Sequence, residues 1–334
     1  MFAILQPLKF SSVDTRSYQT LIDREIGRQK FGREPVSLYE PIRYLMALGG
    51  KRLRPMLALL SYSLYKKDVR PAVPYAVAVE AFHNFTLMHD DIMDKAPLRR
   101  GHPTVHKKWN TSTAILSGDV MLVKVYDMFS ALDDATFKRV IASFNTCAAQ
   151  VCEGQQWDME FEASTKVSEG EYIKMIRLKT AALLGFSLEL GAILAGAPEN
   201  DRLALRAFGT NVGIGFQLKD DLLDAYADPE KFGKQVGGDI ISNKKTFLLI
   251  KAMEKASAGE KKRLKFWLTE KKFNKAEKVA DVKRIYDKLD IPILTEQKIN
   301  LYFKKGFAQL EKLPETPAKI LLREFTERLV GRQV

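Results

Sequence analysis

Two clusters of aspartates with the same spacing lie far apart in the chain. The first occupies residues 90–94 and the second residues 220–224, and both read Asp-Asp-x-x-Asp. Residues four apart share one face of a helix. Asp90 and Asp94 are therefore expected to project together, and so are Asp220 and Asp224.

This arrangement favours a divalent cation. Like charges at this spacing destabilise an isolated helix by about 0.2–0.5 kcal/mol per pair, and a bound cation would offset the repulsion. Ligand sets made only of oxygen favour Mg²⁺, which keeps several waters and is completed by substrate phosphates. Either cluster alone also fits a solvated acidic helix end. Two matched clusters, each after an apolar run, favour metal sites.

Basic residues accompany both clusters. Residues 49–55, Gly-Gly-Lys-Arg-Leu-Arg-Pro, place three cations at a predicted helix start, where the helix dipole and free N–H groups also favour an anion. Arg99 and Arg100 follow the first cluster, whereas Lys234 and then Lys244 follow the second. A basic turn by itself is more often simply solvated. Carboxylates alternating with cations along the same stretches predict two diphosphates, held by Mg²⁺ on one side and by Lys and Arg on the other.

Other phosphate and metal sites are excluded by their spacing. Residues 49–51 lack the upstream glycine and the following Ser or Thr of a P-loop, and Gly213 and Gly215 have no third glycine of a dinucleotide motif. Four histidines and two cysteines at these spacings do not build a zinc site. His89, beside the first cluster, is as consistent with a structural role as with a catalytic base.

The apolar spacing is helical nearly throughout, and alternating β-branched runs are scarce, so the sequence predicts an all-α fold. The Asp clusters end two of the predicted helices. Apart from short helices after residue 246, the main predicted helices cover residues 37–48, 56–65, 74–94, 112–132, 137–161, 181–195 and 202–226.

Composition bounds the organisation of the chain. The 334 residues are 46% hydrophobic and contain no linker or low-complexity run, which favours a single domain over 1–334 with a motif-bearing core at about 37–255. We read neither a transmembrane segment nor a signal peptide, and two cysteines predict no disulfide framework, so a cytoplasmic location is expected. The net charge of +12 favours polyanionic partners, which include nucleic acid, anionic lipid and phosphorylated small molecules. Aromatics are not interleaved with the basic runs, so no nucleic acid is expected.

At these motifs the chain resembles the trans-isoprenyl diphosphate synthases of the polyprenyl synthetase family. The shared motifs follow the family's order across about 49–250, whereas residues 1–35 and 255–334 match only as helical sequence. Besides residues 49–55, the motifs are Leu-Met-His-Asp-Asp-Ile-Met-Asp at 87–94, Arg-Arg-Gly at 99–101, Gly-Gln at 154–155, Lys-Thr at 179–180, Gly-Phe-Gln-Leu-Lys-Asp-Asp-Leu-Leu-Asp at 215–224, Gly-Lys at 233–234 and Gly-Gly-Asp at 237–239.

The resemblance implies antiparallel helices around a deep central cavity, usually in a homodimer. It also implies a prenyltransferase in which an allylic diphosphate ionises, isopentenyl diphosphate attacks C1 of the cation, and a proton is lost. Asp90, Asp94 and Asp220 match the Mg²⁺ ligands, and Asp91, Asp221 and Asp224 match residues that support them, with up to three ions expected. The family positions that bind the allylic diphosphate are matched here by Arg99, Lys179, Thr180, Gln217, Lys234 and Lys244. The family positions that bind isopentenyl diphosphate are matched here by Lys51, Arg54, His83 and Arg100.

Product length is expected to depend on the helix that carries Asp90. Phe85 lies five residues before Asp90, about 7.5 Å along a helix, and in relatives an aromatic residue there accompanies short products. Thr86 departs from the doubly aromatic floor of some farnesyl synthases, and the first cluster lacks the two-residue insertion of many bacterial ones. These features favour geranylgeranyl diphosphate (C20) slightly over farnesyl diphosphate (C15).

Three alternatives remain open at this point. The chain is also consistent with a longer-chain polyprenyl diphosphate synthase. A non-catalytic partner subunit is disfavoured because both Asp clusters and both arginines are intact. A terpene cyclase is disfavoured because it would not need cations for a second diphosphate.

Overall fold

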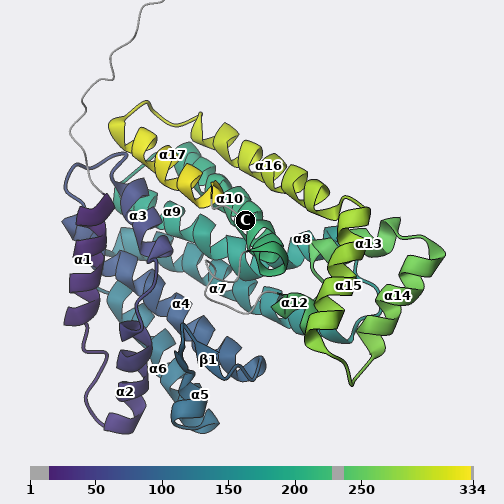
Figure 1. Ribbon diagram of the computed structural model, residues 1–334. Helices are drawn as coiled ribbons and strands as arrows, with labels where there is room; N and C mark the ends of the chain where they lie inside the picture. The colour runs from purple at the N-terminus through teal and green to yellow at the C-terminus, as the bar shows by residue number, and fades with distance from the viewer. Residues whose placement is uncertain (1–14, 228–236, 332–334) are drawn as a thin grey trace, which may run out of the picture. The chain divides into compact units, whose positions relative to one another are not determined.

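The structure is a computed structural model that describes residues 15–227 and 237–331. Within these residues the chain is almost entirely helical (Figure 1). Its strands there are β1 (Leu98–Arg99) and β2 (His102–Pro103), which form an antiparallel pair. The predicted all-α fold is confirmed.

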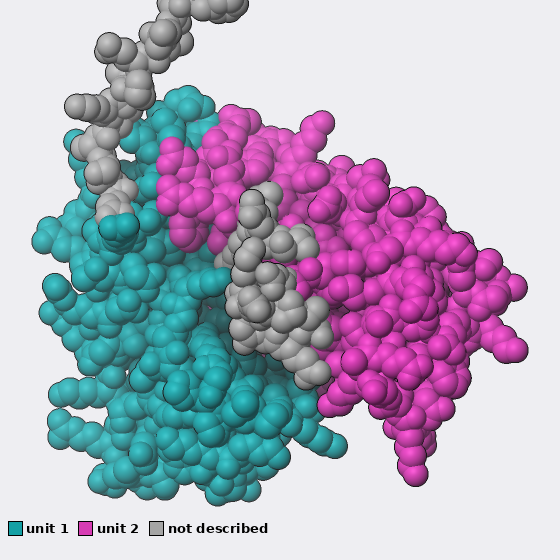
Figure 2. Space-filling view, in the orientation of Figure 1, with its two compact units in different colours: residues 1–143, 187–202, 314–322 teal, residues 144–186, 203–313, 323–334 magenta. Residues whose placement is uncertain are grey.

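The chain divides into two compact units (Figure 2). Unit 1 comprises residues 1–143, 187–202 and 314–322, and unit 2 comprises residues 144–186, 203–313 and 323–334. That the whole chain acts as one domain stays a prediction.

Unit 1 is built around α4 (Val73–Met93), which contacts α1 (Thr15–Arg28), α2 (Val36–Ala47), α3 (Leu53–Tyr62) and α6 (Thr111–Phe129). An unbroken buried run from Ala76 to Phe82 shows that α4 is covered on all sides. The first Asp cluster ends this helix. Shorter elements of unit 1 are η1 (Arg70–Ala72) and α5 (Val105–Lys108).

Unit 2 contains the second Asp cluster, near the end of α10 (Glu199–Tyr226). Its other elements include α8 (Glu169–Ile176), the π-helical segment η2 (Arg177–Ala181), α12 (Gly238–Ile241), α13 (Phe247–Lys255), α14 (Ala258–Thr269), α15 (Lys275–Lys288) and α16 (Ile291–Leu310). Three further helices, α7 (Asp134–Ala163), α9 (Ala182–Leu194) and α17 (Pro317–Val330), complete the described chain.

Close packing of α7 on η2 depends on Gly154. A Cβ atom at this position would lie 2.2 Å from the backbone nitrogen of Lys179. No side chain fits at that distance, so glycine allows the π-helical segment to approach α7. This contact places Lys179 and Thr180, two of the predicted substrate-binding residues.

The main predicted helices are confirmed, with ends that differ by a few residues. The sequence pattern predicts no helix between residues 161 and 181, yet α8 and η2 form there. The start of α8 does carry a signal, because Ser168 and Glu171 form a capping box. None of the helices in the described ranges is long and apolar enough to cross a membrane.

Candidate active site

The first Asp cluster occupies the C-terminal end of α4, where no basic residue stands in the last turn. Carboxylates at a helix C-terminus are disfavoured by the helix dipole, by about 0.3–1 kcal/mol each. The helical geometry continues to Asp94, whose backbone N–H donates to the Asp90 carbonyl at 2.9 Å. Asp90 and Asp94 are therefore one helical turn apart, as their spacing predicts.

Asp91 has a different role from its two neighbours. It is buried and accepts two hydrogen bonds from Arg99, with Nε to Oδ2 at 2.8 Å and Nη2 to Oδ1 at 2.7 Å. This bidentate pair joins α4 to β1 and compensates one charge of the cluster. Arg99, predicted to bind the allylic diphosphate, is thus bound to the cluster's middle aspartate.

Cations surround His83, which lies two turns before Asp91 on α4. Burial and the positive charges of Arg54, Arg100, Arg99 and Arg52, in that order of effect, hold the pKa of His83 well below its ordinary value. The imidazole is therefore neutral near pH 7 and can donate one N–H to an anion. The structure thus brings together four of the residues predicted from the sequence: Arg54, His83, Arg99 and Arg100.

The loop before α3 corrects one expectation. Of its three cations, Lys51 is exposed and Arg54 is half-buried in the first turn of α3, but Arg52 is only 5% exposed. Arg52 donates to the Glu80 carboxylate instead of presenting its charge at the helix start. The sequence could not show this, because the direction of residue 52 depends on its left-handed backbone, with φ of 45°.

His89 and Phe85 pack together on α4. Their ring centroids lie 4.8 Å apart in an edge-on arrangement, and His89 Nε2 lies 3.2 Å from the Ile115 carbonyl oxygen. These contacts favour the structural reading of His89. Phe85 also lies 5.7 Å from Phe82, and the Thr86 hydroxyl donates to the His83 carbonyl at 2.8 Å.

The second cluster repeats the pattern of the first. Asp221, its middle aspartate, is buried and accepts hydrogen bonds from the Tyr172 hydroxyl and from Gln217 Nε2, the latter at 2.9 Å. Burial and the nearby charge of Asp239 raise the pKa of Asp221 well above its ordinary value. In both clusters the middle aspartate is bound by the protein itself.

Asp224 anchors the segment that follows α10. Its carboxylate accepts the Asp239 N–H at 2.8 Å, and its carbonyl accepts the Gly237 N–H at 2.6 Å. The third member, Asp220, is half-buried on α10. Asp224 thus fixes the backbone at the start of α12 and places Asp239 beside the cluster.

A pocket in unit 2 gathers acidic and basic side chains. Lys179 Nζ donates to Asp158 Oδ2 at 2.6 Å, and the Thr180 hydroxyl donates to Gln217 Oε1 at 3.0 Å. Lys244 follows α12 and donates its backbone N–H to the Asp239 carbonyl at 3.0 Å. The polar residues that line the pocket are Asp158, Tyr172, Lys179, Thr180, Gln217, Asp221, Asp239, Lys244, Lys245 and Thr246.

Sequence reasoning missed four residues of this pocket: Asp158, Tyr172, Asp239 and Lys245. Asp239 stands in a recognised motif, and Asp158 lies one helical turn after another, so both carried a usable signal. Tyr172 and Lys245 carried none, because their positions depend on tertiary packing. Lys234, predicted to bind substrate, lies outside the described residues.

The donor atoms of the two Asp clusters are carboxylate oxygens, which suit Mg²⁺. Among the residues in the described ranges, no three acidic, His or Cys side chains gather into a cage. Mg²⁺ does not require one, because it is commonly bound by one or two carboxylates together with substrate phosphates and waters. Asp90 and Asp94 in unit 1, and separately Asp220 in unit 2, carry carboxylate oxygens of the kind that this coordination uses.

Known proteins resemble the chain over most of its length. A family model described as polyprenyl synthetase matches residues 35–289. A geranylgeranyl pyrophosphate synthase of Geoglobus acetivorans is 36% identical over 314 residues, which cover 93% of this chain and 96% of the relative.

Solved structures agree. A crystal structure of a geranylgeranyl pyrophosphate synthase matches with a TM-score of 0.92 at 42% identity, covering 97% of this chain and 100% of the other. A polyprenyl synthase from Caulobacter crescentus CB15, complexed with calcium and isoprenyl diphosphate, has a TM-score of 0.86 at 26% identity, covering 98% and 100%.

The chain therefore belongs to the polyprenyl synthetase family. It is a short-chain prenyltransferase, and its family uses a divalent metal and isoprenoid diphosphates. The resemblance seen in the motifs is confirmed.

The pKa of Asp239 predicts a pH dependence of stability. Burial, followed by the charge of Asp224, raises this pKa from 3.8 to about 6. The folded state then binds more protons than the unfolded state between these values, so the free energy of unfolding falls as pH rises through them. Asp239→Asn removes this pH-dependent loss of stability. Without metal or substrate, the melting temperature of the variant minus that of the wild type should therefore increase as pH rises through this window. Calorimetry in EDTA measures the difference. An equal difference at both ends of the window would contradict this.

Proposed function

We propose that this chain condenses isopentenyl diphosphate head to tail with an allylic diphosphate, with geranylgeranyl diphosphate (C20) as the main product. One observation carries the proposal. Each unit combines an Asp-Asp-x-x-Asp helix end with nearby Lys or Arg side chains, and in each the middle aspartate accepts hydrogen bonds from the protein. The geranylgeranyl synthases among the relatives support C20 over C15.

Asp90, Asp94 and Asp220 are the proposed Mg²⁺ ligands, with up to three ions when diphosphate is bound. The family match assigns these three aspartates, and the one-turn spacing of Asp90 and Asp94 on α4 supports that pair. When bound, Mg²⁺ stabilises the negative charge that develops on the departing diphosphate.

The cations around each cluster divide between the two substrates. We assign Lys179, Thr180, Gln217 and Lys244 of unit 2 to the allylic diphosphate. The family match also assigns Arg99 of unit 1 and, beyond the described residues, Lys234. Lys179 now donates to a carboxylate, and a diphosphate oxygen offers an equivalent charge-assisted acceptor.

Isopentenyl diphosphate is assigned to Lys51, Arg54, His83 and Arg100. A neutral His83 donates one N–H without adding another charge to a crowded cationic group. In the reaction the C1–O bond of the allylic substrate breaks, the isopentenyl double bond forms a new bond to C1, and a proton is lost. A homodimer and a cytoplasmic location remain predictions.

The proposal is tested by supplying radiolabelled isopentenyl diphosphate with allylic primers of increasing length. We expect consumption of label and a main product that yields a C20 alcohol after phosphatase treatment. Products beyond C20 would favour a longer-chain synthase. Absence of turnover would favour a partner subunit, and release of hydrocarbon would favour a cyclase.

Removing a metal ligand should nearly abolish turnover. Asp90→Asn and Asp220→Asn each keep the side-chain shape but lose a charged oxygen ligand, and we expect kcat to fall by at least about 100-fold, equivalent to roughly 2.7 kcal/mol. Asp68→Asn, at an exposed ion pair with Arg70, is the matched control and should retain normal turnover. Steady-state kinetics at saturating Mg²⁺ decide the question. Near-normal rates in both variants would refute the metal assignment.

The two cation sets should separate in their kinetics. Arg100→Ala should raise mainly the KM for isopentenyl diphosphate, and Lys179→Ala mainly the KM for the allylic primer. Loss of a charge-assisted hydrogen bond costs about 1.5–3 kcal/mol, or roughly ten- to over a hundredfold. Equal effects on both substrates would show that the assignment is wrong.

Product length should respond to Phe85. Its phenyl ring packs against His89 and Phe82, and Phe85→Ala would open space about 7.5 Å along α4 from Asp90. We expect the main product to lengthen by at least one C5 unit, measured by mass spectrometry. Phe266→Ala, at an exposed ring on α14, should leave the length unchanged. If Phe85→Ala also leaves it unchanged, the chain-length limit lies elsewhere.

A further inference from the structure

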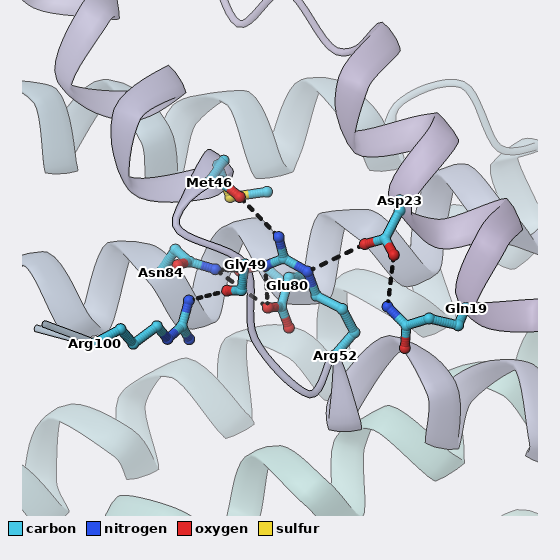
Figure 3. Close-up of polar contacts among 8 residues, drawn as sticks. All are labelled: Gln19, Asp23, Met46, Gly49, Arg52, Glu80, Asn84 and Arg100. Carbon is cyan, nitrogen blue, oxygen red and sulfur yellow. Dashed lines mark hydrogen bonds and ion pairs between the residues drawn. The ribbon is translucent and has the colours of Figure 1, made fainter. Parts of the chain in front are cut away.

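A buried ion pair lies beneath the cations assigned to isopentenyl diphosphate. Arg52 Nη1 donates to Glu80 Oε1 at 2.9 Å, and these residues are 5% and 2% exposed (Figure 3). Neither side chain belongs to the residues that the family motifs assign to substrate. Such a pair needs a reason, because burying two charges costs desolvation energy that their attraction does not always repay.

Arg52 holds three helices at once. Besides Glu80 on α4, its Nη2 donates to the Met46 carbonyl at 2.7 Å in the last turn of α2. Its Nε lies 3.5 Å from Asp23 Oδ1 on α1. Arg52 also stands at the start of α3, so one guanidinium fixes where the α2–α3 loop begins and ends.

Glu80 is itself held in place. Asn84, one turn later on α4, donates its Nδ2 to the Glu80 carbonyl at 2.8 Å and lies 3.4 Å from Oε1 (Figure 3). Asn84 is fully buried. The carboxylate that receives Arg52 therefore has a defined position on a helix covered on all sides.

The loop fixed by Arg52 holds Arg100. Gly49 and Gly50 adopt φ of 75° and 138°, which favour glycine. The Gly49 carbonyl accepts from Arg100 Nη1, and a Cβ on Gly50 would lie 3.0 Å from the Arg100 guanidinium. The Gly49–Gly50 backbone thus forms the binding surface for the Arg100 guanidinium, and Lys51 is the next residue in the sequence.

Charge points to the same relation. Arg52, Arg54, Arg99 and Arg100 all act on His83, which lies one turn after Glu80. Glu80 supplies a buried negative charge to this group and attracts Arg100 as well. Without it the arginines would repel one another with less compensation.

We propose that Glu80 and Arg52 are positioning residues for isopentenyl diphosphate. They do not touch the substrate but fix the Gly49–Gly50 backbone, which in turn positions Arg100 and Lys51. This inference rests on the proposed function. It assigns a role in substrate selectivity to a pair that would otherwise be regarded as part of the fold.

The test compares Glu80→Gln and Arg52→Met with Glu189→Gln. The control removes another buried carboxylate of unit 1, which accepts from the Ser143 hydroxyl at 2.6 Å. We expect both variants to raise the KM for isopentenyl diphosphate by about tenfold or more, equivalent to roughly 1.4 kcal/mol. The KM for the allylic primer should stay within about twofold. The affinity of each variant for isopentenyl diphosphate alone, measured by calorimetry, should fall by the same factor. The control should change none of these values.

A double-mutant cycle separates positioning from general destabilisation. If Glu80 acts through Arg100, Glu80→Gln should have a clearly smaller effect on the isopentenyl KM in an Arg100→Ala background than in the wild type. Additive effects, or equal changes in both KM values at an unchanged melting temperature, would overturn the inference.

If Glu80→Gln or Arg52→Met does not fold, a conservative variant still tests the inference. Arg52→Lys keeps the charge, but a single ammonium cannot reproduce the fork that spans Glu80 and Met46. We expect an intermediate rise in the isopentenyl KM, and no rise would overturn the inference. If the wild type does not consume isopentenyl diphosphate, the proposed function fails. A working wild type with unaffected variants refutes only the positioning role.

Discussion

Repulsion between carboxylates is the constraint on which the Asp cluster of each unit depends. Two helices of this chain end in three aspartates, where the helix dipole is already negative. The protein compensates each cluster at its middle member. In unit 1 Arg99 binds Asp91 through two hydrogen bonds, and in unit 2 Tyr172 and Gln217 bind Asp221. Compensation at the middle position fixes each helix end through a residue other than the proposed metal ligands.

The two compensations differ in kind. Arg99 brings a full positive charge to Asp91, whereas the hydrogen-bond donors to Asp221 are neutral and its pKa is raised by burial and by Asp239. The raised pKa favours the protonated carboxyl of Asp221, which lowers the repulsion within the second cluster. Lys179 and Lys244 line the same pocket.

Much of the fold could be predicted from the sequence, because long helices with a 3.6-residue apolar period have few alternatives. α4 and α10 were expected at 74–94 and 202–226 and are observed within a few residues of those limits. Their Asp clusters also specified the chemistry. The direction of Arg52 could not be predicted, because it depends on a left-handed backbone and on partners from three other helices. The pairing of Asp158 with Lys179 could not be predicted either, because Lys179 is presented by a segment that departs from α-helical geometry.

That segment, η2, has a consequence for how such a site can change. A π-helical turn accommodates one more residue than an α-helical turn, so it rotates the preceding helix, α8, by about 100° relative to the succeeding helix, α9. The chain is thereby continuous from α8 to α9, but its side chains point in two directions: Tyr172 contacts Asp221, and Lys179 contacts Asp158. Deleting a single residue here would restore a regular helix and turn one set of side chains away from the pocket. The length of this segment therefore decides which side chains reach the pocket, in addition to the identity of Lys179.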